Sequence, residues 1–332
     1  MTMGRTDSLT APPVKLPRGF KRLKAACRVP ASAANLGPGF DCLGLALQLF
    51  NEMACELAGA KDHVEIVGEG ANELPTDSSN LVIKAMHAAC EHLGRKPVPF
   101  QVRCVNRIPL SRGLGSSSSA IVGGVFLANE LCGRPLDKDQ LFTLAATIEG
   151  HPDNVAPALH GGLTVSIGEN PKDFQTLAVD LDSLNKWKYV VCIPECTVNT
   201  VKARKALPKQ VSLKDAIYNV GRASMVVASL LKGPGKNANA VLKDAMNDRL
   251  HQPARAKMIP ARDEVMAAAY DAGALGVCVS GSGPTILAIA SKWATRIGEA
   301  MVAEFQKADC AARYEVLNFE AAGTISLGVH NF

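Results

Sequence analysis

The chain has 332 residues, of which 47% are hydrophobic and 20% are charged, a balance typical of a soluble globular protein with enough core material for two domains. Its 36 basic and 31 acidic residues leave a net charge of +5, which is too small to indicate nucleic-acid binding, and only 5% of the residues are aromatic. No apolar run reaches the length of a membrane span.

Ten cysteines are spread through the chain. In a protein with a large core this distribution indicates free thiols in a reducing compartment, so we expect a cytoplasmic protein. Cys192 and Cys196 form a CxxxC pair, but no second Cys or His pair stands at zinc spacing. A metal or redox role for this pair is therefore the minor alternative.

The first 20 residues are basic, contain a Pro pair and lack an apolar core, which favours a flexible tail over a secretory signal; a short transit peptide is the minor alternative. Strands are then predicted at 23–35, 36–49, 55–59, 63–70, 100–109, 161–168, 187–194, 274–280 and 284–290, and two more close the chain. Helices are predicted at 81–93, 120–131, 137–150, 201–207, 212–232, 238–247, 260–272 and before the final two strands.

Local signals support several of these boundaries. Ser79 or Asn80 can cap the first helix, and Gly94 closes it. Asp137 and Gln140 have the spacing of a capping box at the start of the third helix. Strands and helices alternate without a sustained parallel repeat, so the fold class is predicted to be α+β.

The polar stretch 170–188 has little periodicity and predicts a domain boundary. It leaves a tail at 1–20, a first domain at 21–170 and a second domain at 185–332. Two small-residue turns, one in each half, are compatible with a cleft between domains.

The segment Pro109–Ala120, PLSRGLGSSSSA, is the strongest functional signal. A predicted strand leads into it and an apolar helical pattern follows, so backbone amides and hydroxyls meet at a helix N-terminus, which attracts anions. Gly113 and Gly115 permit positive φ and a close approach to phosphate. The spacing fits neither Walker A nor the dinucleotide fingerprint. Taken alone, the segment is also compatible with a turn that only caps a helix.

Three other polar patches are unsuited to a plain core: ASAANLGPGFD at 31–41, IEGHPDNVAP at 148–157 and SGSGP at 280–284. Their convergence would suit a phosphorylated ligand, because each charge must be met as water is excluded. Glu149 stands near a helix C-terminus, where the dipole disfavours it, and a nearby cation would resolve that mismatch. A Mg²⁺ ion held by one carboxylate and one hydroxyl would be such a cation.

The motifs PASAANLGPGFDCLGLAL, PLSRGLGSSSSA, EGHPDNVAPALHGG and SGSGPT, in this order, resemble those of the GHMP kinases over about residues 24–330. The first and third resemble the branch of that family that phosphorylates homoserine. The resemblance implies a β-rich N-terminal domain with a left-handed βαβ crossover, and a ferredoxin-like C-terminal α/β sandwich whose last strand can pack back on the first domain. It also implies a homodimer that uses ATP and Mg²⁺ to make O-phospho-L-homoserine from L-homoserine, a step of threonine biosynthesis.

The resemblance also implies residue roles by position. The ATP phosphate loop would comprise Pro109, Ser111, Arg112, Gly113, Leu114, Gly115, Ser116, Ser117, Ser118 and Ser119, with Asn80 and Leu81 near the adenine. Ser117, or Ser116 in its place, and Glu149 would hold Mg²⁺, while Asn35, Asp41, His151, Arg204 and Arg255 would contact homoserine. Gly281, Ser282 and Gly283 would form the third turn, and Asp153, Asn154 and Arg204 the catalytic group, with Asp153 as an orienting residue or a base.

The chemistry of homoserine agrees with these roles. Arg204 and Arg255 can clamp its carboxylate through bidentate donors, and Asp41 can pair with its ammonium group. The alternatives are another small-molecule kinase of the mevalonate or sugar type, or a ligand-sensing protein of the same fold without catalysis. Loss of a phosphate-loop residue or of the acidic metal ligand would mark the sensing protein, and neither is lost.

Overall fold

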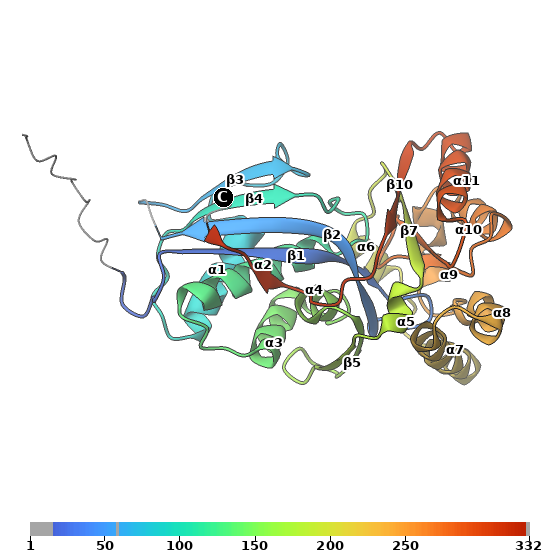
Figure 1. Ribbon diagram of the computed structural model, residues 1–332, viewed down its shortest axis with the longest axis horizontal. Coiled ribbons are helices and arrows are strands. Elements are labelled where there is room, and N and C mark those ends of the chain that lie inside the picture. Colours follow the sequence, from blue (N-terminus) through green and yellow to red (C-terminus); the bar gives the residue numbers. More distant parts are fainter. Residues whose placement is uncertain (1–15, 58–59, 330–332) are drawn as a thin grey trace, which may run out of the picture.

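The computed structural model describes residues 16–57 and 60–329 and shows two α/β units side by side (Figure 1). The strands are β1 (Lys24–Ala34), β2 (Leu43–Glu56), β3 (His63–Gly68), β4 (Gln101–Asn106), β5 (Leu163–Ile167), β6 (Gln175–Val179), β7 (Lys188–Pro194), β8 (Gly276–Val279), β9 (Ile286–Ala290), β10 (Ala312–Leu317) and β11 (Ile325–Ser326). The helices are α1 (Leu81–His92), α2 (Ser116–Leu131), α3 (Lys138–Glu149), α4 (Val155–His160), α5 (Asp182–Asn185), α6 (Thr200–Lys205), α7 (Leu213–Lys232), α8 (Lys236–Ala245), α9 (Gln252–Arg255), the 3-10 turn η1 (Ala256–Met258), α10 (Arg262–Asp271) and α11 (Ala294–Lys307).

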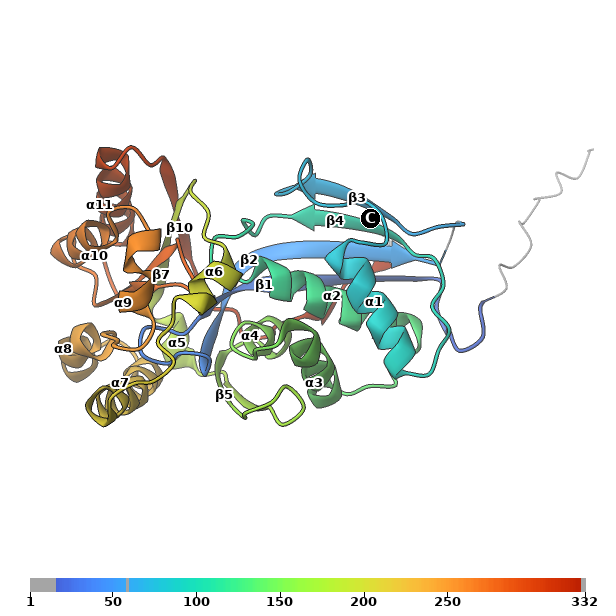
Figure 2. The same ribbon diagram turned by 180° about the vertical axis from the view of Figure 1, so that it is seen from behind.

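The first sheet has seven strands, ordered β11-β1-β2-β4-β3, with β5 paired to β2 and β6 paired to β5. Only β3 and β4 are parallel among these pairs, and α1 connects them in a βαβ unit. Helices α1 to α4 gather on one face of the sheet (Figures 1 and 2). The last strand, β11, returns from the second unit and pairs with β1.

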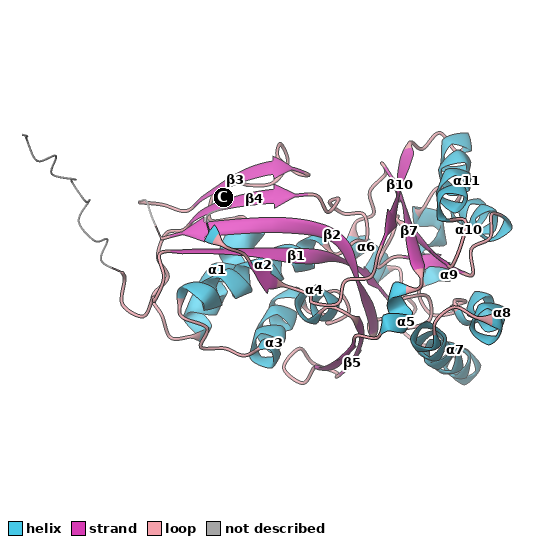
Figure 3. Ribbon diagram, in the orientation of Figure 1, coloured by secondary structure: helices cyan, strands magenta, loops and turns pink. Residues whose placement is uncertain are grey.

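The second sheet is antiparallel, in the order β10-β7-β9-β8. Its connections run from β7 through helices to β8 and β9, then through α11 to β10, which is the βαββαβ pattern of a ferredoxin-like unit. The alternation of strands and helices in both units is plain in Figure 3. The predicted α+β class is confirmed.

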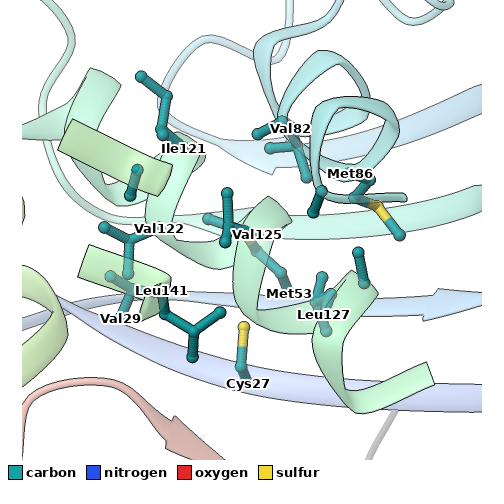
Figure 4. Packing of buried hydrophobic residues seen from close by; sticks show 14 of the residues in the cluster. Cys27, Val29, Met53, Val82, Met86, Ile121, Val122, Val125, Leu127 and Leu141 are labelled. Carbon is teal, nitrogen blue, oxygen red and sulfur yellow. The ribbon is translucent and has the colours of Figure 1, made fainter. Parts of the chain in front are cut away.

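The core of the first unit lies between its sheet and α2. Cys27 and Val29 of β1, Met53 of β2, and Ile121 and Val125 of the helix belong to one cluster of buried hydrophobic side chains (Figure 4). Burial of each large apolar side chain contributes about 1.5–3 kcal/mol. This packing fixes α2 against the sheet, and with it the loop that precedes the helix.

Several boundaries differ from the sequence prediction. Helix α2 begins at Ser116 rather than Ala120, because the serines occupy its first turn, where free amides make their poor helix propensity unimportant. The strand predicted at 55–59 is wrong as a separate element, since β2 continues without a break to Glu56. Helix α8 begins at Lys236, inside the predicted loop 233–237.

Four short elements were not predicted, namely α4, α5, α9 and β6, and neither was the 3-10 turn η1. The three helices have four to six residues, too few for a helical period to be recognised. Strand β6 is mostly exposed and pairs with β5 alone, so it carries no alternating apolar pattern.

The division of the chain depends on β6, which lies inside the stretch 170–188 yet belongs to the first sheet. We therefore propose that the domain boundary follows β6, within residues 180–187. Of the tail expected at 1–20, residues 1–15 lie outside the described residues. Phe20 is buried, with its ring centroid 6.5 Å from that of Phe100, so the packed structure of the first unit begins before residue 21.

The sequence also raised the pairing of the cysteines and the presence of a membrane span. The ten cysteines all fall within the described ranges and are free. Among the helices at 16–57 and 60–329, none is long and apolar enough to cross a membrane.

Candidate active site

The main cavity has a volume of about 480 Å³ and is lined by residues of both units. All four polar patches of the sequence reach it: Asn35 and Asp41; Ser111, Arg112, Gly113, Gly115, Ser116 and Ser117; Glu149, His151, Asp153 and Asn154; and Gly281 and Ser282. Arg204 and Arg255 of the second unit line it as well. The fold therefore brings most of the predicted site residues together in one place.

The Gly/Ser loop ends in Gly115, which caps α2 in the left-handed conformation at φ +74°. No side chain caps the helix, so its first amides and the positive end of a 16-residue dipole face the cavity. Gly113 also has a positive φ, +77°, and a Cβ there would lie 2.2 Å from the carbonyl oxygen of Ser280. Only glycine fits this contact between the loop and the turn at 280–284.

Two side chains tie the loop to the second unit. Ser280 Oγ donates to the Gly113 carbonyl at 2.7 Å. Arg112 Nε donates to the Pro194 carbonyl at 3.0 Å and its Nη2 to the Glu195 carbonyl at 2.8 Å. The guanidinium of Arg112 is thus engaged with backbone oxygens, and its position makes it a tether of the loop more than a phosphate ligand.

Glu149, the last residue of α3, faces the N-terminus of α2. Ser117 Oγ and Ser118 Oγ both donate to Glu149 Oε1 at 2.8 Å. These hydroxyls and the helix dipole of α2 offset the unfavourable position of the carboxylate at the end of α3. Two hydroxyls and a carboxylate are hard oxygen donors suited to Mg²⁺. The described residues contain no cluster of three or more His, Cys, Asp or Glu for a metal.

The half-buried His151 and the buried Asp153 form a pair beside this group. The distance from His151 Nδ1 to Asp153 Oδ1 is 2.7 Å, and His151 Nε2 lies 3.9 Å from Glu149 Oε1. Burial by itself lowers the pKa of His151, but the hydrogen bond to Asp153 and the charges of Asp153 and Glu149 outweigh it, so the pKa is raised. The pair therefore favours a protonated imidazolium in the cavity.

Arg204 and Asp41 meet across the two units. Nη1 and Nη2 of Arg204 donate to Oδ2 and Oδ1 of Asp41, each at 2.9 Å, in a bidentate ion pair. Burial lowers the pKa of Arg204, but the hydrogen bonds and charge of Asp41 outweigh it and raise the pKa. Asp41, expected to face an ammonium group, is thus paired with an arginine of the other unit.

Arg255 is only 3% exposed, and its Nη1 donates to the Gly281 carbonyl at 3.2 Å. Burial, with the nearby charge of Arg204, lowers its pKa. Its guanidinium carbon lies 5.3 Å from the ring centroid of Phe40, and that of Arg204 lies 5.8 Å from the same ring. The two arginines therefore stand around one aromatic ring, beside Asp41.

Three asparagines use their amides to shape the cavity. Asn35 Nδ2 donates to the Gly281 carbonyl at 2.9 Å, while its Oδ1 accepts from the amide of Asp41 at 3.0 Å. Asn80 caps α1 by accepting from the Val82 amide at 2.9 Å. Asn154 Oδ1 accepts from Ser32 Oγ at 2.8 Å. These contacts hold loops in place before any ligand arrives.

Some expected site residues lie behind the cavity wall, and some residues that line the cavity were not expected. Pro109, Leu114, Ser118, Ser119 and Gly283 are buried and do not line the cavity. The lining residues to which the sequence assigned no place in the site are Phe40, Asn51, Met53, Ile66, Glu73, Leu74, Pro75, Ser79, Val82, Cys104, Asn106, Ala120 and Thr200. Most are apolar and look like ordinary core residues in the sequence, so no local signal could have singled them out.

Comparisons with known proteins agree with this geometry. The family model described as the GHMP kinases N terminal domain matches residues 80–162, and that described as GHMP kinases C terminal matches residues 226–307. The chain is 42% identical over 280 residues to a homoserine kinase of Moorella thermoacetica, covering 84% of this chain and 92% of that relative.

Solved structures are also similar. A crystal structure of homoserine kinase from Cytophaga hutchinsonii superposes with a TM-score of 0.81 at 29% identity, covering 94% of this chain and 100% of that one. A crystal structure of mevalonate kinase has a TM-score of 0.64 at 16% identity, covering 89% of this chain and 99% of that one, and shares the fold.

Proposed function

Because the chain belongs to the homoserine kinases of the GHMP kinase family, it is an enzyme that phosphorylates homoserine with ATP, and we propose that it does so in the cavity between its two units. The product is O-phospho-L-homoserine, a precursor of threonine. One observation carries the assignment of the site: Asp41, Arg204 and Arg255 line the same cavity as the N-terminus of α2 and Glu149.

The nucleotide is assigned to the side of the cavity formed by the first unit. The amides at the start of α2 would bind the phosphates, aided by the hydroxyls of Ser116 and Ser117. The apolar wall near Asn80 and Leu81 would enclose the adenine. Helix α2 is buried in the core of this unit, so its dipole is oriented before ATP binds.

Ser117 and Glu149 are the residues we propose as the Mg²⁺ site. Their oxygens lie 2.8 Å apart, and the carboxylate supplies the charge that a divalent cation requires. When bound, the ion would offset the charge that develops on the nucleotide. Ser118, which donates to the same carboxylate oxygen, would hold Glu149 in place.

The acceptor is assigned to the charged side of the cavity. Arg204 and Arg255 would bind the carboxylate of homoserine, and Asp41 its ammonium group. Arg204 already contacts Asp41, so the incoming zwitterion would insert its two charges between partners that are close together. Mevalonate has no ammonium group, and its binding would leave Asp41 without that partner.

The transfer step forms a bond between the homoserine side-chain oxygen and the γ-phosphorus and breaks the bond to the β,γ-bridging oxygen, releasing ADP. The transition state is loose, so positioning and charge stabilisation matter more than a strong base. Asp153 is 3% exposed and bound to His151, which favours an orienting role over that of a base. The hydroxyl proton can leave to a phosphate oxygen or water. His151, Asn154 and Arg204 would orient and stabilise the reacting groups.

We extend the proposal to three properties of the whole protein. Mg²⁺ dependence is supported by the oxygen donors beside α2. A homodimer is supported by the family resemblance, and light scattering would test it. A cytoplasmic location is supported by ten free cysteines, since a reducing compartment keeps thiols unpaired.

The function is tested by incubating the purified protein with Mg-ATP and L-homoserine, mevalonate, shikimate or galactose, and following ADP release. ADP should form with homoserine well above the rate without acceptor, and the other alcohols should stay near background. A homoserine rate equal to background would refute the proposal, and a higher rate with mevalonate or galactose would favour the sibling-kinase alternative.

A further inference from the structure

His251 is a fully buried histidine that lies immediately before α9, outside the four motifs, and contacts both halves of the acceptor side. Its Nε2 lies 2.7 Å from the carbonyl oxygen of Gly37, in the loop that leads to Asp41. Its Nδ1 lies 3.1 Å from Arg255 Nη1. The imidazole thus links the loop of the first unit to an arginine of the second.

The partners determine the protonation state of this ring. A guanidinium can only donate, so Nδ1 must accept, and a carbonyl can only accept, so Nε2 must carry the proton. The neutral tautomer satisfies both contacts. Burial lowers the pKa of His251, which agrees with a neutral ring.

Stacking adds a second constraint on the arginines. The rings of His251 and Phe40 are stacked, with centroids 5.1 Å apart and planes 26° apart. Phe40 in turn lies 5.3 Å from the guanidinium carbon of Arg255 and 5.8 Å from that of Arg204. Both guanidinium groups therefore rest around a ring whose orientation His251 fixes.

Asp248 anchors the segment that carries His251. Its side chain is buried and accepts from the amides of His251 at 2.9 Å and Gln252 at 2.6 Å. Asn219 of α7 donates to Asp248 at 2.6 Å and to the Pro38 carbonyl at 3.1 Å. The same network therefore fixes the histidine and the loop next to Gly37.

We propose that His251 is a positioning residue that sets acceptor specificity by holding Arg255 at a fixed place relative to Asp41. The inference rests on the proposed function of the cavity. With His251 in place, Arg255, the proposed partner of the carboxylate, is held at a fixed place relative to Asp41, the proposed partner of the ammonium group. Homoserine binding should then depend on His251, although the residue contacts neither substrate.

Two substitutions separate the two hydrogen bonds. In His251→Asn the amide oxygen can replace Nδ1 and accept from Arg255, but the side chain is too short to reach Gly37. In His251→Gln the amide nitrogen can replace Nε2 and donate to Gly37, but the acceptor at Nδ1 is lost, so that Arg255 keeps only the backbone carbonyls of Ala203 and Gly281. His87→Asn is the control, because His87 lies on α1 against Asp62 and does not line the cavity.

The assay measures KM for homoserine, KM for ATP and kcat, together with selectivity against L-homoserinol, in which a hydroxymethyl group replaces the carboxylate. His251→Gln should raise the homoserine KM roughly 10- to 100-fold, the effect of losing a hydrogen bond to a charged group. Its preference for homoserine over homoserinol should fall by a similar factor. His251→Asn should change both less, and ATP KM and kcat should stay within about threefold.

Equal loss of homoserine and ATP binding, or unchanged selectivity in His251→Gln, would overturn the proposal. A thermal unfolding scan and Mg-ADP binding establish that each variant is folded. If His251→Gln does not fold, Phe40→Leu replaces it, because this change removes the aromatic support and leaves both buried hydrogen bonds. It should raise the homoserine KM several-fold, and an unchanged value would also overturn the proposal. Failure of the wild-type protein to phosphorylate homoserine would instead refute the proposed function.

Discussion

The two sides of the cavity are built in different ways. The nucleotide side rests on one continuous segment, Pro109–Ala120, which runs into a helix buried in the core of the first unit. The acceptor side is assembled from residues far apart in the sequence, such as Asp41 and Arg204, which are separated by 163 positions. One side uses backbone amides and a dipole, and the other uses charged side chains.

This difference explains how one fold can serve several acceptors. Amides at a helix N-terminus bind phosphate whatever the acceptor is, and their geometry follows from the backbone. The acceptor side depends on a few side chains, which can be exchanged without disturbing the helix. Substitutions on the two sides should therefore have separable kinetic effects.

The largest difference between effects on kcat and on the homoserine KM is expected from Glu149→Gln. Loss of the carboxylate charge should lower kcat roughly 10²- to 10³-fold, the usual effect of removing one group that stabilises transition-state charge. The homoserine KM should change little, because Glu149 belongs to the nucleotide side. Steady-state rates at saturating substrates measure this, with Glu299→Gln on α11 as the control. An unchanged kcat would show that Glu149 is not a ligand of Mg²⁺.

Gly113→Ala tests the point at which the two sides touch. A Cβ at this position would lie 2.2 Å from the Ser280 carbonyl in a residue with φ +77°. We expect the free energy of unfolding to fall by about 1–3 kcal/mol. Urea unfolding measures this change.

Gly221→Ala on α7 is the matched control, since nothing lies within 4 Å of the position of its Cβ. This change should stabilise the protein by about 0.5–1 kcal/mol, because Ala favours the helix more than Gly. Equal effects of the two substitutions would contradict the close contact at Gly113.

A smaller effect is expected from Asp153→Asn. Asp153 raises the pKa of His151 above its ordinary value of 6.5, so the substitution should lower that pKa, which an NMR titration measures. A raised pKa in the folded state contributes stability that is fully present below about pH 6.5 and is lost as the pH rises through the folded value. The free energy of unfolding that His151 contributes should therefore be smaller in the variant than in the wild-type protein at low pH. At high pH the two proteins should not differ in this contribution. An unchanged pKa of His151 would show that Asp153 does not interact with it.

The sequence predicted the nucleotide side better than the acceptor side, for a physical reason. A Gly/Ser loop between a strand and a helix has a local signature, and Gly113 and Gly115 have the positive φ it requires. Arg204 and Arg255 carry no such signature, and they would be taken for solvated charges without the resemblance. Tertiary contacts alone reveal that Arg255 is buried and that Asp41 pairs with Arg204.

The elements of the fold also differ in how well the sequence predicts them. The long helix α7 and the capping box at Asp137 and Gln140 follow from sequence patterns. The short helix α9, which carries Arg255 of the acceptor side, and the short helix α4, which follows Asn154, have too few residues to show a helical period in the sequence. The same holds for His251, whose role depends on contacts with Gly37 and Arg255 across the two units.

The separation of the two sides is tested most directly by calorimetric titration of homoserine and of Mg-ADP into Arg255→Leu, with Arg222→Leu as the control on α7. Removal of one partner of a buried charge pair costs about 2–5 kcal/mol, so homoserine should bind roughly 30-fold more weakly or worse. Mg-ADP should bind with unchanged affinity. Equal weakening of both ligands would contradict the separation of the two sides and the clamp on the homoserine carboxylate.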